Sequence, residues 1–154
     1  MRQPLVAGNW KMNGSLDSIK ELVEGIKTGM DTVTTAEMAI CPPYVYIPQV
    51  AAMLEGTAIS LGAQDVNDQE SGAHTGEIAA GMLSDVGCKY AIVGHSERRS
   101  IYGESDEFTA RKFAAARMAG LVPILCVGEL LDEREQGVTQ QVVARQLDAV
   151  IDLE

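Results

Sequence analysis

The amino-acid sequence predicts an α/β fold in which parallel strands alternate with helices. Short apolar runs of β-type residues begin near Leu5, Met38, Ile59, Tyr90 and Leu121. A helix-like segment follows each run, and successive runs start about 20 to 30 residues apart, which is typical of strand–helix–strand units. Because neighbouring parallel strands need a crossover connection, this alternation indicates a parallel sheet whose strands are joined by helices.

The first two helical segments carry start and stop signals. Asn13 and Gly14 form a turn, and Ser15 can cap the helix that follows it. The second helix is expected to begin around Pro48 and to stop before Gly56. One face of the first helix collects four apolar residues: Leu16, Ile19, Val23 and Ile26.

A polar, glycine-containing loop at 65–75 follows the third apolar run. Structureless connections of this length are uncommon in compact domains, so we expect the loop to have a function or a partner. A third helix is predicted over 77–86, and a fourth begins after Ser105 and ends before Gly120.

The last helical segment is predicted to pack through an apolar face that stays in register to the end of the given sequence. No glycine cap follows this pattern. The face consists of Val143, Leu147, Val150 and Ile151. With 154 residues, of which 46% are hydrophobic, the sequence supplies one sizeable core, and a single domain is the expectation.

Composition and charge exclude several classes of function. The formal net charge is -10, from 22 acidic and 12 basic residues. No basic run could follow a phosphate backbone, so nucleic-acid binding is not expected, and any anion must be held locally. The three cysteines lack paired spacing, which indicates a reducing, cytoplasmic setting. No apolar stretch approaches the roughly 18 residues of a membrane span, and no signal sequence is recognised.

The first strand exits into a chemically active sequence. Asn9 and Lys11 fall on one face of the extended chain, while Trp10 points to the other. An amide and an ammonium group on one face could bind an anionic substrate. The alternative is a lysine that extends into solvent at the end of a strand.

The fourth strand exits into residues 94–99, where a histidine, a hydroxyl group and three charged side chains follow an apolar run directly. His95 precedes a short helical turn that begins at Ser96, and the positive end of the helix dipole there disfavours imidazolium. A neutral ring can donate a hydrogen bond to a carbonyl. The alternative is a capped helix start with solvated ion pairs.

Other reactive residues and motifs give weaker signals. His74 lies in the polar loop and is expected to be exposed and outside the site. Cys126 is interpreted as a packed core residue rather than a nucleophile. No dinucleotide-binding or phosphate-loop glycine motif occurs, and no residues have metal-ligand spacing, so neither a cofactor nor a metal is predicted.

Four motifs closely resemble those of the triosephosphate isomerase family. They are G-N-W-K-M-N-G at 8–14, G-A-Q-D-V leading to G-A-H-T-G-E over 62–77, Y-A-I-V-G-H-S-E-R-R at 90–99 and C-V-G-E at 126–129. The resemblance implies a TIM (β/α)8 barrel, with residues 1–154 forming a single incomplete barrel domain of about five β/α units. It also implies a cytoplasmic homodimer that interconverts dihydroxyacetone phosphate and glyceraldehyde 3-phosphate through an enediolate in glycolysis and gluconeogenesis, without a cofactor.

The resemblance also assigns roles to individual residues. Lys11 looks like the cation that binds the phosphate and stabilises developing negative charge, and Asn9 like its orienting neighbour. His95 looks like the neutral electrophile that moves protons at the enediolate oxygens, and Glu97 like a carboxylate that supports both. The loop around Thr75, with His74 and Gly76 beside it, looks like the arm that forms the dimer.

The sequence departs from the family pattern in one respect. The family's glutamate base, in a Y-E-P-x-W-A-I-G-T-G motif, and its later glycine-rich phosphate loops have no counterpart in these residues. We therefore expect the chain to be inactive alone. Two alternatives remain: a non-catalytic half-barrel that acts as an assembly module, and a doubly wound nucleotide-binding domain, which would need a phosphate-binding glycine fingerprint.

Overall fold

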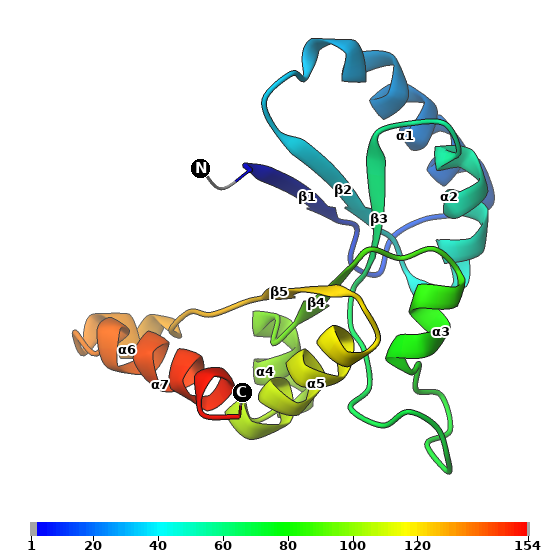
Figure 1. Cartoon of the computed structure of the whole chain (residues 1–154). Coiled ribbons are helices and arrows are strands. Elements are labelled where there is room, and N and C mark those ends of the chain that lie inside the picture. The colour runs from blue at the N-terminus through cyan, green and yellow to red at the C-terminus, as the bar shows by residue number, and fades with distance from the viewer. Residues whose placement is uncertain (1–2, 154) are drawn as a thin grey trace.

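The computed structural model describes residues 3–153 and contains one five-stranded sheet of order β1-β2-β3-β4-β5. Every neighbouring pair of strands is parallel, as the strand–helix alternation predicted. The strands curve into a half-barrel rather than a flat sheet (Figure 1). Their bounds are β1 (Leu5–Asn9), β2 (Glu37–Cys41), β3 (Ile59–Ala63), β4 (Tyr90–Val93) and β5 (Val122–Leu125).

The helices lie along the convex side of the strands and leave the concave side open (Figure 1). They are α1 (Leu16–Gly29), α2 (Ile47–Leu54), α3 (Ala80–Asp85), α4 (Ser96–Tyr102), α5 (Asp106–Met118), α6 (Leu131–Glu135) and α7 (Thr139–Ile151), with short 3-10 turns η1 (Met30–Thr32) and η2 (Tyr44–Tyr46). The main apolar core fills the space between these helices and the strands. It includes Ile19, Val23, Ile40, Val50, Leu61, Ala63, Leu83, Ala91, Val93 and Ala116.

The predicted helix starts are confirmed in detail at α1 and α5. The Ser15 hydroxyl accepts a hydrogen bond from the Ser18 amide, and the Ser18 hydroxyl accepts one from the Ser15 amide, so that two otherwise unpaired donors are satisfied. At α5 the Ser105 hydroxyl accepts from the amide of Phe108. Helix α1 buries Ile19 and Val23, but Leu16, which was assigned to the same face, is 60% exposed.

The third helix begins later than the sequence predicted. Residues 77–79 stay outside the helix because Asn67 engages them. The Asn67 amide donates to the carbonyl of Ile78 at 2.9 Å, and its side chain donates to Glu77 Oε2 at 2.7 Å. Asn67 and Ala79 also form an isolated parallel bridge. The loop after β3 therefore closes on itself before α3 can start at Ala80.

The predicted apolar face of the last helix is confirmed at Val150 and wrong at Leu147 and Ile151. Helix α7 buries Val142, Gln146 and Val150, while Leu147 and Ile151 are exposed. Gln146 faces inward because its side-chain amide pairs with both backbone groups of Gly128, at 2.8 and 3.1 Å. A buried polar residue thus takes a place that the hydrophobic pattern assigned to leucine. Helix α6 was also not predicted.

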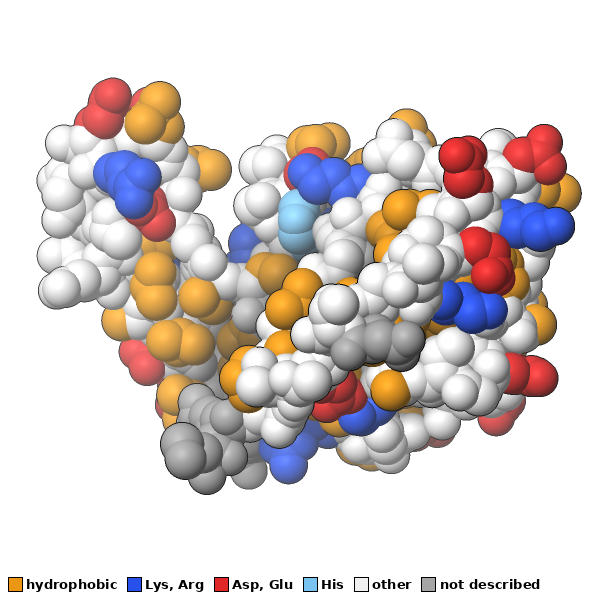
Figure 2. Space-filling view, turned by 90° about the horizontal axis from the view of Figure 1, so that it is seen from above, with side chains coloured by type: hydrophobic (Ala, Val, Ile, Leu, Met, Phe, Trp, Pro, Cys, Tyr) orange, Lys and Arg blue, Asp and Glu red, His pale blue; other side chains and the backbone are white. Residues whose placement is uncertain are grey.

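The two edge strands are exposed because each has only one neighbour. Val6 in β1 is 57% exposed and Val122 in β5 is 47% exposed, whereas all four residues of the interior strand β4 are buried. The space-filling view shows a deep notch in the molecule with hydrophobic side chains along its walls (Figure 2). Within residues 3–153, no helix combines the length and the apolar character needed to cross a lipid bilayer.

Candidate active site

The exits of β1 and β4 bring together three of the side chains selected from the sequence. Lys11 Nζ lies 2.7 Å from Glu97 Oε1, although the two residues are 86 positions apart in the chain. The other carboxylate oxygen of Glu97 lies 3.5 Å from Nδ1 of His95. An ammonium group, a carboxylate and an imidazole therefore form a continuous cluster at the carboxyl ends of parallel strands, where βα folds place their functional groups.

The backbone at the exit of β1 is held in an unusual conformation. Lys11 has φ +52°, and within the described residues it is the one non-glycine residue with positive φ. The Asn9 side chain accepts from the Lys11 amide at 3.0 Å, and Gln64 donates to the Lys11 carbonyl at 2.8 Å. Such backbone costs on the order of 1–3 kcal/mol and persists only where its surroundings hold it. The strain therefore fixes the direction in which the lysine leaves the strand.

Gln64 is a member of this site that the sequence interpretation missed. Its side-chain amide also donates to the Cys41 carbonyl at 2.9 Å, so it joins the exits of β1, β2 and β3. The signal was present, because Gln64 directly follows the third strand, as Lys11 and His95 closely follow theirs. An uncharged amide in that position did not stand out from a polar loop.

His95 caps helix α4, and this position defines which ring nitrogen carries the proton. Nδ1 accepts a hydrogen bond from the Glu97 amide at 3.2 Å. A nitrogen that accepts from a backbone amide is unprotonated, so a neutral ring has its proton on Nε2. The His95 side chain is 22% exposed. The imidazole is thus arranged to donate a hydrogen bond from Nε2 rather than to accept one.

The central ion pair of the cluster joins the positive ammonium group of Lys11 to the negative carboxylate of Glu97. The hydrogen bond from Lys11 lowers the pKa of Glu97 below its usual value, so the carboxylate is ionised at neutral pH. The Lys11 and Glu97 side chains are 52% and 43% exposed, and ion pairs that exposed contribute little to stability. The pair is better suited to orienting the ammonium group than to stabilising the fold.

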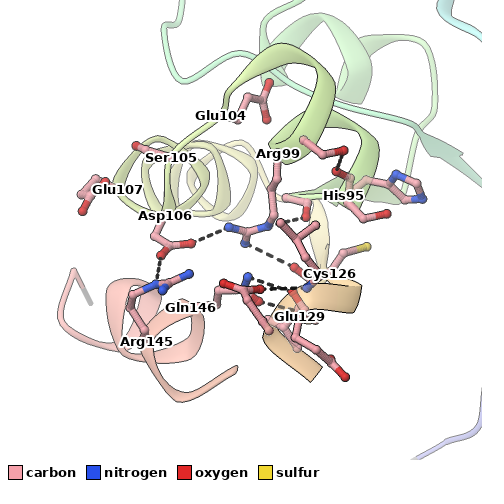
Figure 3. A pocket seen from close by; sticks show the side chains of 17 residues that line it. His95, Arg99, Glu104, Ser105, Asp106, Glu107, Cys126, Glu129, Arg145 and Gln146 are labelled. Atoms are coloured by element: carbon pink, nitrogen blue, oxygen red, sulfur yellow. Dashed lines mark hydrogen bonds and ion pairs between the residues drawn. The ribbon is translucent and has the colours of Figure 1, made fainter. Parts of the chain in front are cut away.

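A cavity of about 540 Å³ opens beside His95, between α4, the start of α5, the segment after β5 and α7 (Figure 3). Arg99 and Arg145 reach Asp106 across this space, and Gln146 approaches the loop near Glu129 (Figure 3). Neither Lys11 nor Asn9 lines the cavity. The candidate site is therefore defined by the side-chain cluster at the strand exits, with the cavity as its neighbour.

Cys126 lines the same cavity and is half-buried. Burial raises the pKa of its thiol, with a smaller opposing effect of Arg99. A thiol that stays protonated is a poor nucleophile, which agrees with the packing role expected for this residue. Within residues 3–153, no group of three or more potential ligands is arranged to hold a metal ion.

The residues expected to form a dimer arm occupy the tip of the loop between β3 and α3. His74, Thr75 and Gly76 are all exposed. The tip is shaped by its own backbone, since the His74 amide donates to Gly72 and the Glu77 amide donates to the His74 carbonyl. His74 lies away from the strand exits in sequence and takes no part in the Lys11 cluster. The role of this tip in dimer formation stays a prediction.

The arginines after His95 are not the solvated ion pairs that the alternative interpretation required. The Arg98 side chain is 30% exposed and contacts Asp65 and Glu104, and Arg99 is 13% exposed. Lys112 is fully buried and reaches the same two carboxylates, at 2.9 and 2.5 Å. Desolvation raises the pKa of Asp65 despite these cations. The segment after β4 is therefore anchored to the rest of the fold by buried charge pairs.

Comparisons with known proteins give a consistent result. The family model described as triosephosphate isomerase matches residues 4–153. The triosephosphate isomerase of Nitrosococcus oceani is 52% identical over 153 residues, which is 99% of this chain and 61% of the relative. That of Thiobacillus denitrificans is 57% identical over 151 residues, 98% of this chain and 60% of the relative.

A solved structure shares the fold as well as the sequence. The crystal structure of triosephosphate isomerase from Bartonella henselae superimposes with a TM-score of 0.91 at 41% identity, and the match covers 97% of this chain and 62% of that one. The chain thus spans about three-fifths of the length of the relatives it matches.

Proposed function

The chain belongs to the triosephosphate isomerase family, and from this we propose that it carries the electrophilic part of an active site that interconverts dihydroxyacetone phosphate and glyceraldehyde 3-phosphate. The observation that carries the proposal is the contact of Lys11 with Glu97, 2.7 Å apart, beside an imidazole whose Nδ1 is already occupied. Residues 1–154 are proposed to act as one domain.

Lys11 is proposed to bind the phosphate and to stabilise negative charge that develops on the substrate. An ammonium group offers three donors and a full positive charge, which suits an anion held locally on a protein of net charge -10. Asn9 supports this role because it accepts from the Lys11 amide and fixes the strained turn. Glu97 holds the ammonium group in place without burying it.

His95 is proposed to act as a neutral electrophile. Isomerisation moves a proton between adjacent carbons through an enediolate, and charge builds on the two oxygens that these carbons carry. A donor aimed at those oxygens stabilises them and can return the proton. The hydrogen bond from the Glu97 amide to Nδ1 supports this role, because it leaves Nε2–H as the donor of the neutral ring.

The general base is the missing part of this mechanism. The 154 residues contain no counterpart of the family's glutamate motif, so abstraction of the substrate proton has no candidate among them. We propose that the chain isomerises triose phosphates only together with residues that supply this base. General-base catalysis typically contributes on the order of a hundredfold to ten-thousandfold to a rate.

The family also suggests a homodimer and a cytoplasmic location for the active protein. The exposed tip at His74, Thr75 and Gly76 supports the first of these, since the tip is closed by its own hydrogen bonds and remains free to contact a second subunit.

A fusion protein tests the proposed function. Residues 1–154 would be joined to the remaining part of the Thiobacillus denitrificans relative, and isomerisation would be followed by a coupled assay. We expect activity, with a loss of about a hundredfold or more in kcat for His95→Gln and in kcat/KM for Lys11→Met. Lys27→Met, on α1, where the lysine pairs with Glu24, is the matched control and should leave activity unchanged. A folded fusion without activity would favour the alternative of a non-catalytic assembly module.

A further inference from the structure

Arg99 uses all three of its guanidinium nitrogens on different partners. Nε donates to the Gly94 carbonyl at 2.7 Å, Nη1 to Asp106 Oδ1 at 2.5 Å and Nη2 to the Cys126 carbonyl at 3.3 Å. These partners belong to the exit of β4, the first turn of α5 and the exit of β5. One side chain, 13% exposed, therefore ties two neighbouring strand exits to a helix start (Figure 3).

The Gly94 carbonyl belongs to the peptide group that joins Gly94 to His95. Gly94 has φ +69°, and a Cβ atom at this position would lie 2.7 Å from Arg99 Nη2 and 2.6 Å from the Thr109 side chain. Only glycine accommodates both the backbone angle and the close approach of the guanidinium group. The plane of the 94–95 peptide, which sets where the His95 side chain begins, is thus fixed by Arg99.

The partner of Arg99 is itself held in place. Asp106 lies in the first turn of α5, and its second oxygen accepts from Arg145 Nε of α7 at 2.8 Å. The Arg145 side chain is 59% exposed and, unlike Arg99, has no hydrogen bond to a strand exit among those described. Two arginines share one carboxylate, but only Arg99 continues to the backbone next to the imidazole.

We propose that Arg99 is a positioning residue for His95. By holding the 94–95 peptide, it aligns Nδ1 with the Glu97 amide and so keeps the proton of the neutral ring on Nε2. The contact with the Cys126 carbonyl ties the guanidinium group of Arg99 to the exit of β5. The imidazole is thereby kept at one position relative to the neighbouring strand exit. The inference rests on the proposed function, in which Nε2–H is the donor to the substrate.

The ring tautomer gives a direct readout, because the sequence has two histidines and only His95 lies at the strand exits. Magic-angle-spinning 15N spectra distinguish the two tautomers near pH 8, above the ordinary histidine pKa of about 6.5. The sample is the histidine-labelled 154-residue chain in complex with an unlabelled polypeptide that supplies the remaining β/α units of a relative. Arg99→Lys keeps the charge but cannot reach three partners at once. We expect it to lower the ratio of Nε2–H to Nδ1–H at His95 about fivefold, the effect of losing one ordinary hydrogen bond.

Arg145→Lys is the matched control, because it alters the other cation on Asp106 and should leave the His95 ratio unchanged. A folded Arg99→Lys chain with the wild-type ratio overturns the proposal, and so does an equal change in both variants. If circular dichroism shows that Arg99→Lys does not fold, Asp106→Asn replaces it as the test variant. This substitution loosens the guanidinium group of Arg99 and should lower the ratio of Nε2–H to Nδ1–H at His95 at least twofold. An unchanged ratio in this variant overturns the proposal. If the fusion protein is inactive but the tautomer ratio responds as expected, the isomerase proposal fails and the proposed role of Arg99 stands.

Discussion

At the scale of single residues, the strained backbone of Lys11 positions the side chain for the site at a cost in folding stability. A left-handed conformation costs an ordinary residue about 1 kcal/mol or more, whereas glycine adopts it freely. We therefore expect Lys11→Gly to be about 1 kcal/mol more stable than Lys11→Met, although both lose the ammonium group. Denaturant unfolding of the two variants within the fusion protein measures the difference, and equal stabilities would show that Lys11 is not strained.

A second prediction at this scale concerns the dependence of the Lys11–Glu97 contact on pH. The folded-state pKa of Glu97 lies below its usual 4.5, chiefly through the hydrogen bond from Lys11. A carboxylate with a lowered pKa contributes stability above its unfolded pKa, and this contribution is lost as the pH falls through the folded value. In the fusion protein, the difference in unfolding free energy between the wild-type form and Glu97→Gln should thus be constant near neutrality and disappear in acid. A difference that grows below pH 4.5 would contradict this sign.

The residue types at the strand exits allowed part of the site to be predicted, but they gave no signal for the remaining members. Lys11, His95 and Glu97 were selected because charged or titratable groups directly behind apolar runs are conspicuous. Gln64 and Arg99 were not selected, because their importance depends on which backbone carbonyls they reach. Those carbonyls belong to strands far away in sequence, and no local pattern reports them.

At the scale of secondary structure, helix α7 shows where hydrophobic periodicity fails. The Gln146 side chain satisfies both backbone groups of Gly128, and Leu147 beside it is 39% exposed. Gln146→Leu should cost about 1–3 kcal/mol, since it leaves a backbone amide and a carbonyl without partners. Leu147→Gln should change stability by less than about 0.5 kcal/mol. Thermal unfolding of both variants within the fusion protein tests the assignment, and the reverse order would restore the face predicted from the sequence.

The element starts and ends followed local chemistry wherever a cap or a glycine was decisive. Ser15 caps α1 as predicted, and α5 begins directly after Ser105 as predicted, with the Ser105 side chain as its cap. Gly120, with φ +81°, lies just past the end of α5. The start of α3 was displaced by Asn67, whose hydrogen bonds keep residues 77–79 outside the helix. Caps depend on neighbouring residues and are readable from sequence, whereas contacts across a loop depend on how that loop closes.

At the scale of the whole molecule, the sheet ends in two edges with exposed apolar side chains. Val6 on β1 and Val122 on β5 remain accessible, and the concave side of the half-barrel is open (Figure 1). Exposed parallel edges favour pairing with other chains. We expect the isolated chain to self-associate as its concentration rises and to lack a sharp cooperative thermal transition. Light scattering and calorimetry test this, and a monodisperse sample that unfolds cooperatively would contradict it.

The exits of β1 and β4 are proposed to place Lys11 and His95 at one binding site for a triose phosphate. The most direct test is a titration of the 15N-histidine-labelled chain with dihydroxyacetone phosphate, in the presence of an unlabelled polypeptide that supplies the remaining β/α units of a relative. We expect the His95 signal to shift and saturate, His74 not to respond, and Lys11→Met to weaken binding about tenfold or more. A His95 signal that ignores the ligand in a folded complex, or binding unaffected by Lys11→Met, would contradict it.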